Sequence, residues 1–291
     1  MEYLIHILII AGIYSILSLG LNLIVGYTGL TALGHIAFAA VGAYTSSLLA
    51  LHIGISPWIG LLIGAVFAAI LGAIVSYPSL RLKGDYLALA TFGLGVIIYS
   101  LAKNWVSLTR GPMGLPGIPS FSLFGLELKL NNIWIYLILV LIFVGITYFA
   151  IRNITKSPFG RILTGIREDE IATEAMGKNI IKHKVIIFMV GAFLAGIAGS
   201  LYAHYITFID PSSFTAMESI TVLLMVVFGG MASLPGSIVG AMVLVIFPEL
   251  LRFLGLPSSI AAPLRQMIYG LLLVALMIFR PKGLIGKYKL K

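Results

Sequence analysis

Long apolar runs separated by short polar stretches dominate this chain of 291 residues. Runs of about twenty apolar residues, the length that a helix needs to cross a bilayer, cover residues 3–25, 30–51, 57–77, 86–102, 133–151, 185–208, 220–250 and 263–279. The pattern predicts an all-α polytopic membrane protein, in which residues 1–291 form a single transmembrane domain of about 8–10 helices with broken or re-entrant segments.

Glycine-rich breaks lie between or within these runs, at residues 26–34 and 229–236. Each is followed by a Gly-Ala pair, at residues 42–43 and 240–241, which indicates a distant internal repeat. Matching breaks in two halves of a transporter point to a substrate path. The residues predicted to line such a path are Asn22, Gly26, Thr28, Gly29, Gly34, His35, Gly229, Gly230, Pro235 and Gly236. For each glycine alone, a turn or close helix packing explains the sequence equally well.

The composition excludes a soluble globule. Hydrophobic residues make up 60% of the chain and charged residues only 10%, with a mean hydropathy of +1.09, so a soluble fold would expose far more apolar surface than one core can bury. Zero cysteines exclude disulfides, thiolate metal sites and a cysteine nucleophile. The first six residues carry no Lys or Arg, which predicts that the first span is not a cleaved signal peptide.

The distribution of Lys and Arg orients the spans. The positive-inside rule places Arg81, Lys83, the loop 152–184 and the basic tail 280–291 in the cytoplasm. The predicted topology is therefore N-out and C-in. To keep the tail inside, region 220–250 must cross twice or not at all, as two short spans or a re-entrant hairpin.

The interiors of the apolar runs lack carboxylates, Lys and Arg, because Asp85, Asp210, Glu218 and Glu249 fall in loops or at span ends. This disfavours an ion-coupled secondary carrier, which keeps ionisable groups near the midplane. Zinc-site, Gly-x-Ser-x-Gly and phosphate-loop motifs are missing from the sequence. We therefore expect no catalytic residues, no metal site and no bound cofactor, and any ATP must be hydrolysed by another polypeptide.

The loop 152–184 is a charged island that contains seven of the nineteen Lys and Arg and four of the ten acids. Ser157 followed by Pro158 is a favourable helix start. From Arg167 onwards the spacing predicts a short helix that ends at Gly177, with a small apolar face and ion pairs between Arg167 and Glu170 and between Glu174 and Lys178. Such a helix fits either a groove on a partner or the lipid headgroups.

On the side of the membrane opposite to the loop 152–184, residues 103–132 form a long connection that contains several Gly and Pro residues. Thirty residues are too many for a simple turn, so we expect a structured external loop that forms part of an outer gate or a dock for a binding protein.

Several motifs occur in order along nearly the whole chain: GLNLIVGYTG at 20–29, LRLKGDY at 80–86, TRGPMGL at 109–115, SPFGR at 157–161, REDEIATEAMG at 167–177, AGIAGSLYA at 195–203 and FGGMASLPG at 228–236. Together they resemble the inner-membrane permease subunits of branched-chain amino acid ABC importers. Arg110 departs from the pattern, since many relatives have glycine there. Urea and short-chain amide importers use similar permeases, so they stay as an alternative.

The resemblance implies a function and a set of partners. The loop 152–184 resembles the EAA loop, whose helix sits in a cleft of the ATPase subunit, and this implies that the ATPase-coupling residues are Arg167, Glu168, Asp169, Glu170, Ala172, Glu174, Ala175, Met176 and Gly177. The implied partners are two ABC ATPase subunits that bind the ATP, a second permease subunit, identical or homologous, and an extracytoplasmic solute-binding protein. The implied location is the cytoplasmic membrane of a prokaryote, with an amino acid as substrate and no nucleic acid partner.

Overall fold

The structure is a computed structural model that describes residues 2–79, 85–123, 126–127, 133–252, 267–268, 270–271, 274 and 282–286. The apolar run predicted at 263–279 lies mostly outside these residues. Arg81, Lys83 and most of the basic tail also lie outside them.

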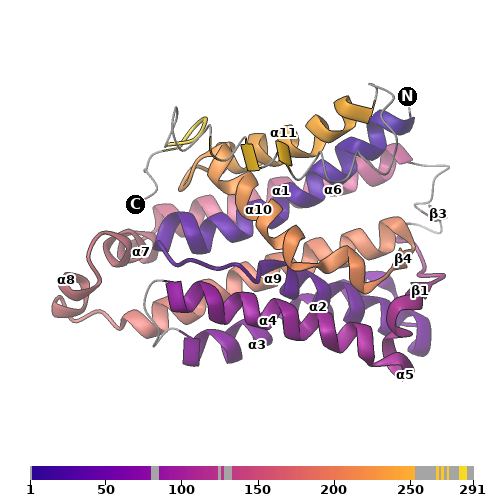
Figure 1. Cartoon of the computed structure of the whole chain (residues 1–291), viewed down its shortest axis with the longest axis horizontal. Helices are drawn as coiled ribbons and strands as arrows, with labels where there is room; N and C mark the ends of the chain where they lie inside the picture. The colour runs from indigo at the N-terminus through magenta and orange to yellow at the C-terminus, as the bar shows by residue number, and fades with distance from the viewer. Residues whose placement is uncertain are drawn as a thin grey trace.

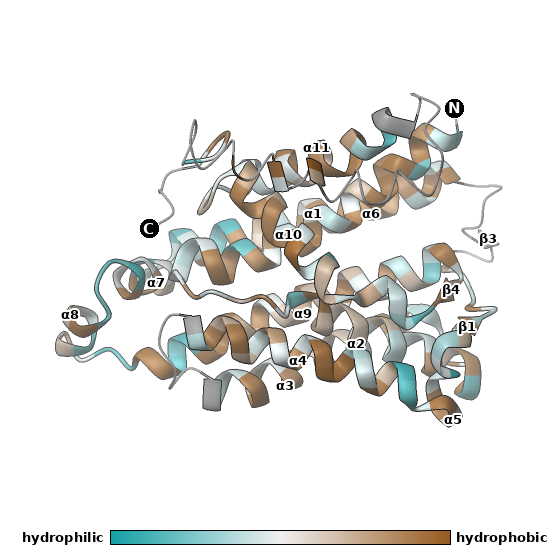
Figure 2. Ribbon diagram, in the orientation of Figure 1, coloured by the Kyte–Doolittle hydropathy of each residue, from teal (hydrophilic) through white to brown (hydrophobic). Residues whose placement is uncertain are grey.

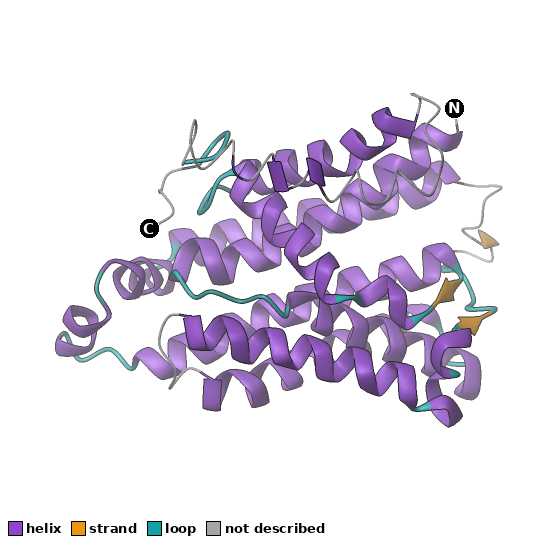
Figure 3. Ribbon diagram, in the orientation of Figure 1, coloured by secondary structure: helices purple, strands orange, loops and turns teal. Residues whose placement is uncertain are grey.

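Within the described ranges, six helices are long and apolar enough to span a membrane. They are α1 (Glu2–Thr28), α2 (His35–Leu48) continued by the π turn η1 (Leu49–Ile53), α3 (Pro57–Ser79), α4 (Asp85–Asn104), α6 (Ile133–Lys156) and α9 (Ile180–Ile206). These helices dominate the structure (Figure 3) and confirm the prediction of an all-α polytopic membrane protein. Helix α9 begins five residues before the predicted run, because the Asn179 side chain caps it by accepting from the amide of Lys182 at 3.0 Å.

The long helices run roughly along the longest axis of the molecule (Figure 1). Helices α7 (Pro158–Glu168) and α8 (Glu170–Ala175) lie at one end, and α5 (Val106–Thr109) with strands β1 (Leu115–Pro116) and β4 (Phe208–Ile209) lies at the other. Hydrophilic residues gather around α7 and α8, whereas the long helices are largely apolar (Figure 2). The loops predicted on opposite sides of the membrane thus lie at opposite ends, and the N-out orientation stays a prediction.

A seam of small residues joins α2, α3 and α9. A Cβ built on Gly42 of α2 would lie 2.7 Å from the carbonyl carbon of Gly196 in α9, and one built on Gly196 would lie 2.8 Å from the Cα of Ala65 in α3. The Ser200 hydroxyl donates to the carbonyl of Gly42 at 3.0 Å. Because membrane helices gain little from burying apolar surface against each other, such backbone contacts and interhelical hydrogen bonds hold them together.

The predicted breaks are present, but they are not equivalent to each other. After α1, residues 29–34 run without helix back toward the middle of the molecule, where α2 begins (Figure 1). The second break separates α10 (Ala216–Gly229) from α11 (Leu234–Arg252), with φ of +114° at Gly230 and +57° at Ala232. The first break corresponds instead to residues 207–215. Residues 29–34 follow α1 and residues 207–215 follow α9, and both of these helices have 27 residues.

Helix α10 has 14 residues and is about 21 Å long at 1.5 Å per residue, too short to cross the hydrocarbon core alone. It starts near the middle of the molecule, and α11 then returns beside α1 (Figure 1). The C-terminal residues 282–286 lie against the end of α10, where the amides of Leu284 and Ile285 donate to the carbonyls of Phe228 and Gly229 at 2.9 Å. The break at Gly229–Gly236 therefore forms a sharp reversal between a short helix and a longer one.

The described part of the predicted external loop is structured. It contains α5, the 3₁₀ turn η2 (Gly111–Met113), β1, β2 (Ser122–Leu123) and β3 (Leu126–Glu127). Strand β1 pairs with β4, which follows α9. His204 of α9 fixes the loop further: its Nδ1 lies 2.6 Å from the carbonyl oxygen of Pro119 and its Nε2 lies 2.6 Å from the Ser46 hydroxyl of α2. In the neutral ring, Nδ1 donates to the carbonyl and Nε2 accepts from the serine.

Candidate functional site

The loop predicted to couple to a partner folds as two short helices. Helix α7 starts at Ser157, whose hydroxyl accepts from the amide of Gly160 at 3.4 Å, with Pro158 in the first turn, as predicted. The prediction of one helix from Arg167 onwards is wrong, because α7 contains Arg167 and ends at Glu168. Asp169 has extended backbone and its carboxylate accepts from the amide of Ala172 at 3.0 Å, so it caps a new helix, α8, and breaks the old one.

Helix α8 presents an apolar face to its surroundings. The side chains of Ile171 and Met176 are 77% and 68% exposed, and Ala172 and Ala175 between them are also exposed. The opposite side is anchored by Thr173, which is buried and donates to the carbonyl of Asp169 at 2.8 Å. The chain then turns at Gly177 with φ of +75°, the left-handed conformation expected of a residue just beyond a helix end. Glu168, Asp169, Glu170 and Glu174 are exposed around this face.

An ion pair holds α8 against the bundle. Lys184 Nζ lies 2.7 Å from Oε1 of Glu170, and the lysine side chain is only 6% exposed. Helical spacing had indicated Arg167 as the partner of Glu170, and this pairing is wrong. Because Lys184 is fourteen residues away on a different helix, no local pattern could have identified it.

The two glycine-rich breaks meet at Asn22. Its side-chain amide donates to the carbonyl of Ser233 at 3.0 Å and to the hydroxyl of Ser237 at 2.6 Å, while its oxygen accepts from the amide of Ala232 at 2.9 Å. One buried side chain thus makes three hydrogen bonds, two to the turn between α10 and α11 and one to Ser237 in the first turn of α11. Gly26, one turn further along α1, leaves room for this contact, since a Cβ there would lie 2.6 Å from the amide nitrogen of Ala232.

The other residues predicted to line a path occupy several places. Thr28, Gly34, His35, Gly229, Gly230 and Gly236 are buried, whereas Gly29 and Pro235 are exposed. Gly229 and Gly236 approach each other so closely that a Cβ on Gly236 would lie 2.9 Å from the carbonyl carbon of Gly229. The structure therefore gives these two glycines a packing role, and a role in lining a path stays a prediction.

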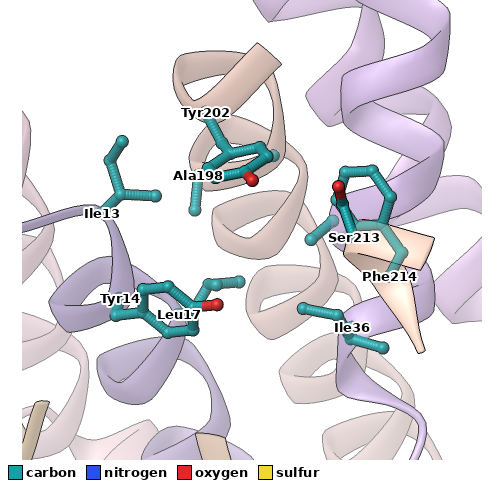
Figure 4. A pocket seen from close by; sticks show the side chains of 10 residues that line it. Ile13, Tyr14, Leu17, Ile36, Ala198, Tyr202, Ser213 and Phe214 are labelled. Atoms are coloured by element: carbon teal, nitrogen blue, oxygen red, sulfur yellow. The ribbon is translucent and has the colours of Figure 1, made fainter. Parts of the chain in front are cut away.

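A small pocket that the sequence analysis missed lies between α1, α2, α9 and the 3₁₀ turn η4 (Pro211–Phe214) (Figure 4). It is lined by Ile13, Tyr14, Leu17, Ile36, Ala39, Ala198, Gly199, Tyr202, Ser213 and Phe214. In Figure 4 the hydroxyls of Tyr14 and Tyr202 point into the space between these elements. Tyr14 donates to a carboxylate oxygen of Glu218 in the first turn of α10 at 2.9 Å. The partners are 204 residues apart in sequence, so spacing gave no signal.

The residues that the structure describes contain no group of three or more His, Asp or Glu that could hold a metal ion. The family described as "Branched-chain amino acid transport system / permease component" matches residues 3–277. The LivM high-affinity branched-chain amino acid transport system permease protein of Escherichia coli K12 is 39% identical over 94% of this chain and 68% of its own length. The chain belongs to this permease family.

More distant members of the permease family match over similar lengths. The probable LivM of Methanocaldococcus jannaschii is 27% identical over 96% of this chain and 92% of its own. The LivH permease protein of Salmonella typhimurium is 23% identical over 94% of this chain and 91% of its own length. Among solved structures, PsaBC from Streptococcus pneumoniae in complex with Fab matches 93% of this chain over 89% of its own length, at 16% identity and with a TM-score of 0.42. Family membership makes this chain a multi-pass transport subunit and not an enzyme, and it confirms the resemblance found in the sequence.

Replacing Lys184 by Met should loosen α8 without unfolding the permease, because it removes the partner of Glu170 but keeps an unbranched side chain in the buried site. Glu170 is about half exposed, so water replaces the lost cation and the cost is roughly 1 kcal/mol, or about fivefold in local opening. Hydrogen exchange at amides 169–176 should accelerate by that factor. The exposed Lys182 on the same helix is the control, and equal exchange in Lys184→Met and Lys182→Met would contradict a role of the ion pair.

Proposed function

We propose that this chain is the membrane-spanning permease subunit of an ATP-driven importer that translocates branched-chain amino acids delivered by a solute-binding protein. The observation that carries the proposal is the match to the permease family over residues 3–277. It is supported by similarity to LivM, which is named for branched-chain amino acid transport. An importer of urea or short-chain amides is not favoured by these relatives, and neither is an ion-coupled carrier.

ATP is hydrolysed on separate subunits in this proposal, and α8 is the contact through which they act. Its apolar face of Ile171, Ala172, Ala175 and Met176 is exposed at the end of the molecule, beyond the long helices. A helix that lay on lipid headgroups would carry Lys and Arg on its polar side, whereas α8 has exposed acids around its apolar face. A groove on a protein partner accommodates small apolar side chains and pairs with the acids at its rim.

The complete transporter in this proposal contains two ATPase subunits, this chain with a second permease subunit, and an extracytoplasmic binding protein. This chain itself binds no cofactor. It lies in the cytoplasmic membrane of a prokaryote with α7 and α8 inside and the loop 103–132 outside. The binding protein docks on that loop, which β1, β4 and His204 hold firmly against the bundle.

Uptake of radiolabelled leucine by proteoliposomes tests the proposal. The chain is reconstituted with its ATPase subunits, second permease and binding protein, and uptake is measured with each component or ATP left out in turn. We expect accumulation of leucine only with the complete set and ATP, and competition by unlabelled isoleucine or valine. Uptake of urea in preference to leucine, or leucine uptake driven by an ion gradient without ATP, would contradict the proposal.

A further inference from the structure

Arg167, in the loop 152–184, contacts α1 of the same chain. Arg167 lies in the last turn of α7, two residues before Asp169, which caps α8. Its guanidinium Nη1 donates to the backbone carbonyl of Gly26 in α1. Its side-chain stem covers Gly29, since a Cβ built there would lie 3.1 Å from Cγ of Arg167. The contact joins positions 141 residues apart.

The carbonyl that Arg167 binds belongs to the last turn of α1. The final four carbonyls of a helix have no partner within it, and a cation at this end also interacts favourably with the helix dipole. The carbonyl of Val25 accepts from the amide of Gly29 at 3.1 Å, which leaves the next carbonyl, that of Gly26, for Arg167. The arginine therefore caps α1 at the point where the first break begins.

Gly26 lies directly against the second break. A side chain at Gly26 would collide with the amide of Ala232 and with the Asn22 side chain. Asn22 in turn holds Ala232, Ser233 and Ser237 by three hydrogen bonds. A displacement of the Gly26 peptide must therefore move the turn between α10 and α11 or break this network.

On its other side, Arg167 is connected to the apolar face of α8 through the residues that join the two helices. Asp169 caps α8 two residues further on. Buried Thr173 of α8 packs on α7, where a Cβ on Gly165 would lie 3.0 Å from the threonine hydroxyl oxygen. A displacement of α8 would therefore act on the last turn of α7 in two ways, through the chain at Asp169 and through the packing of Thr173 against Gly165.

We propose that Arg167 is the positioning residue that couples α8 to the two breaks, through Gly26 and Asn22. This inference rests on the proposed function. It gives two residues roles different from those inferred from the sequence. Arg167 acts inside this chain and not on the ATPase, and Asn22 links α1 to the turn before α11 and does not line a path. Movement of α8 on ATP binding is passed along this series of contacts to the start of α11.

The test compares Arg167→Met with the wild-type chain in the complete transporter. Methionine retains an unbranched stem over Gly29 but cannot donate to the carbonyl. The ATPase subunits should still co-purify, and binding-protein-stimulated ATP hydrolysis should stay within about twofold, while leucine transported per ATP falls roughly tenfold, a size typical of coupling between sites. Arg167→Lys, which keeps a cationic donor, should restore most of the lost ratio. Arg161→Met replaces an exposed arginine on the same helix and should leave the ratio unchanged.

A spectroscopic measurement separates coupling from a merely structural cap. The chain has no cysteine, so a spin label can be placed at Pro235→Cys, an exposed position at the start of α11. Addition of ATP should change the label's spectrum in the Arg167 background and not in Arg167→Met, although both complexes bind ATP. If Arg167→Met fails to assemble, Arg167→Lys is labelled instead, and a reduced ATP-dependent change is expected.

The outcomes distinguish this inference from the proposed function. If the wild-type chain neither recruits the ATPases nor takes up leucine, the proposed function fails. If the wild-type complex does both, and Arg167→Met shows the same transport per ATP and the same ATP-dependent spectrum, the coupling role of Arg167 alone is overturned.

Discussion

Replacing Ala175 by Trp is expected to prevent co-purification of the ATPase subunits with this permease. Ala175 lies on the exposed apolar face of α8 beside Met176. In the docking that we propose, this face enters a groove of the ATPase that fits a methyl group and would not admit an indole ring. Overpacking a close contact costs roughly 1–3 kcal/mol or more, so binding should weaken by at least about fivefold. The permease itself should insert and fold normally, because the side chain at 175 contacts solvent and not the bundle.

Ala150→Trp is a matched control for this variant. Ala150 is exposed near the end of α6, in the apolar part of the chain, and a Trp at that point is compatible with the membrane interface. Both variants are purified in the same detergent, and the retained ATPase and the solute-stimulated rate of ATP hydrolysis are measured. Full retention of both by Ala175→Trp would rule out α8 as the docking contact.

The sequence was sufficient to predict the elements that depend on neighbouring residues. Apolar runs of spanning length gave the six long helices, and local capping chemistry gave the start of α7 at Ser157 and the turn at Gly177. It also gave the exposed face of α8, because the side on which a helical residue lies follows from spacing alone. The helix boundary at Glu168 was not predicted. The spacing of apolar residues placed Asp169 inside a helix, whereas in the structure Asp169 caps the next helix, α8.

The contacts that connect the site could not be predicted in this way. Arg167 and Gly26 are 141 residues apart, and Asn22 and Ser233 are 211 residues apart, so only the packing of α1 between α7 and α11 brings them together. Local pattern identified Asn22 and Gly26 as unusual polar and small residues in an apolar run, but not their partners. The same limit explains why Glu170 was paired with the wrong cation and why the Tyr14–Glu218 contact was missed.

A glycine within an apolar run can mark an internal repeat or a close contact between helices. Gly42 shows the second case and gives the other prediction with a large expected effect. The pair of residues 42–43 entered the sequence analysis as a sign of an internal repeat. In the structure, Gly42 is where α2 crosses α9, with its Cβ position 2.7 Å from the carbonyl carbon of Gly196 and its carbonyl bound by Ser200. Any side chain at residue 42 would meet backbone, which cannot change rotamer to make room.

Gly42→Leu is therefore expected to disrupt the seam between α2, α3 and α9 and to lower stability by at least the roughly 1–3 kcal/mol of an overpacked core. Gly93→Leu is the matched control, because Gly93 lies within α4 and a Cβ there has no other atom within 4 Å. The substitution at position 93 should keep or slightly raise stability, since leucine favours helix more than glycine. Thermal unfolding and size-exclusion chromatography of the two detergent-solubilised variants provide the comparison. We expect a lowered Tm and aggregation for Gly42→Leu only, and an equal Tm for both would show that α2 and α9 can separate at this crossing without loss of the fold.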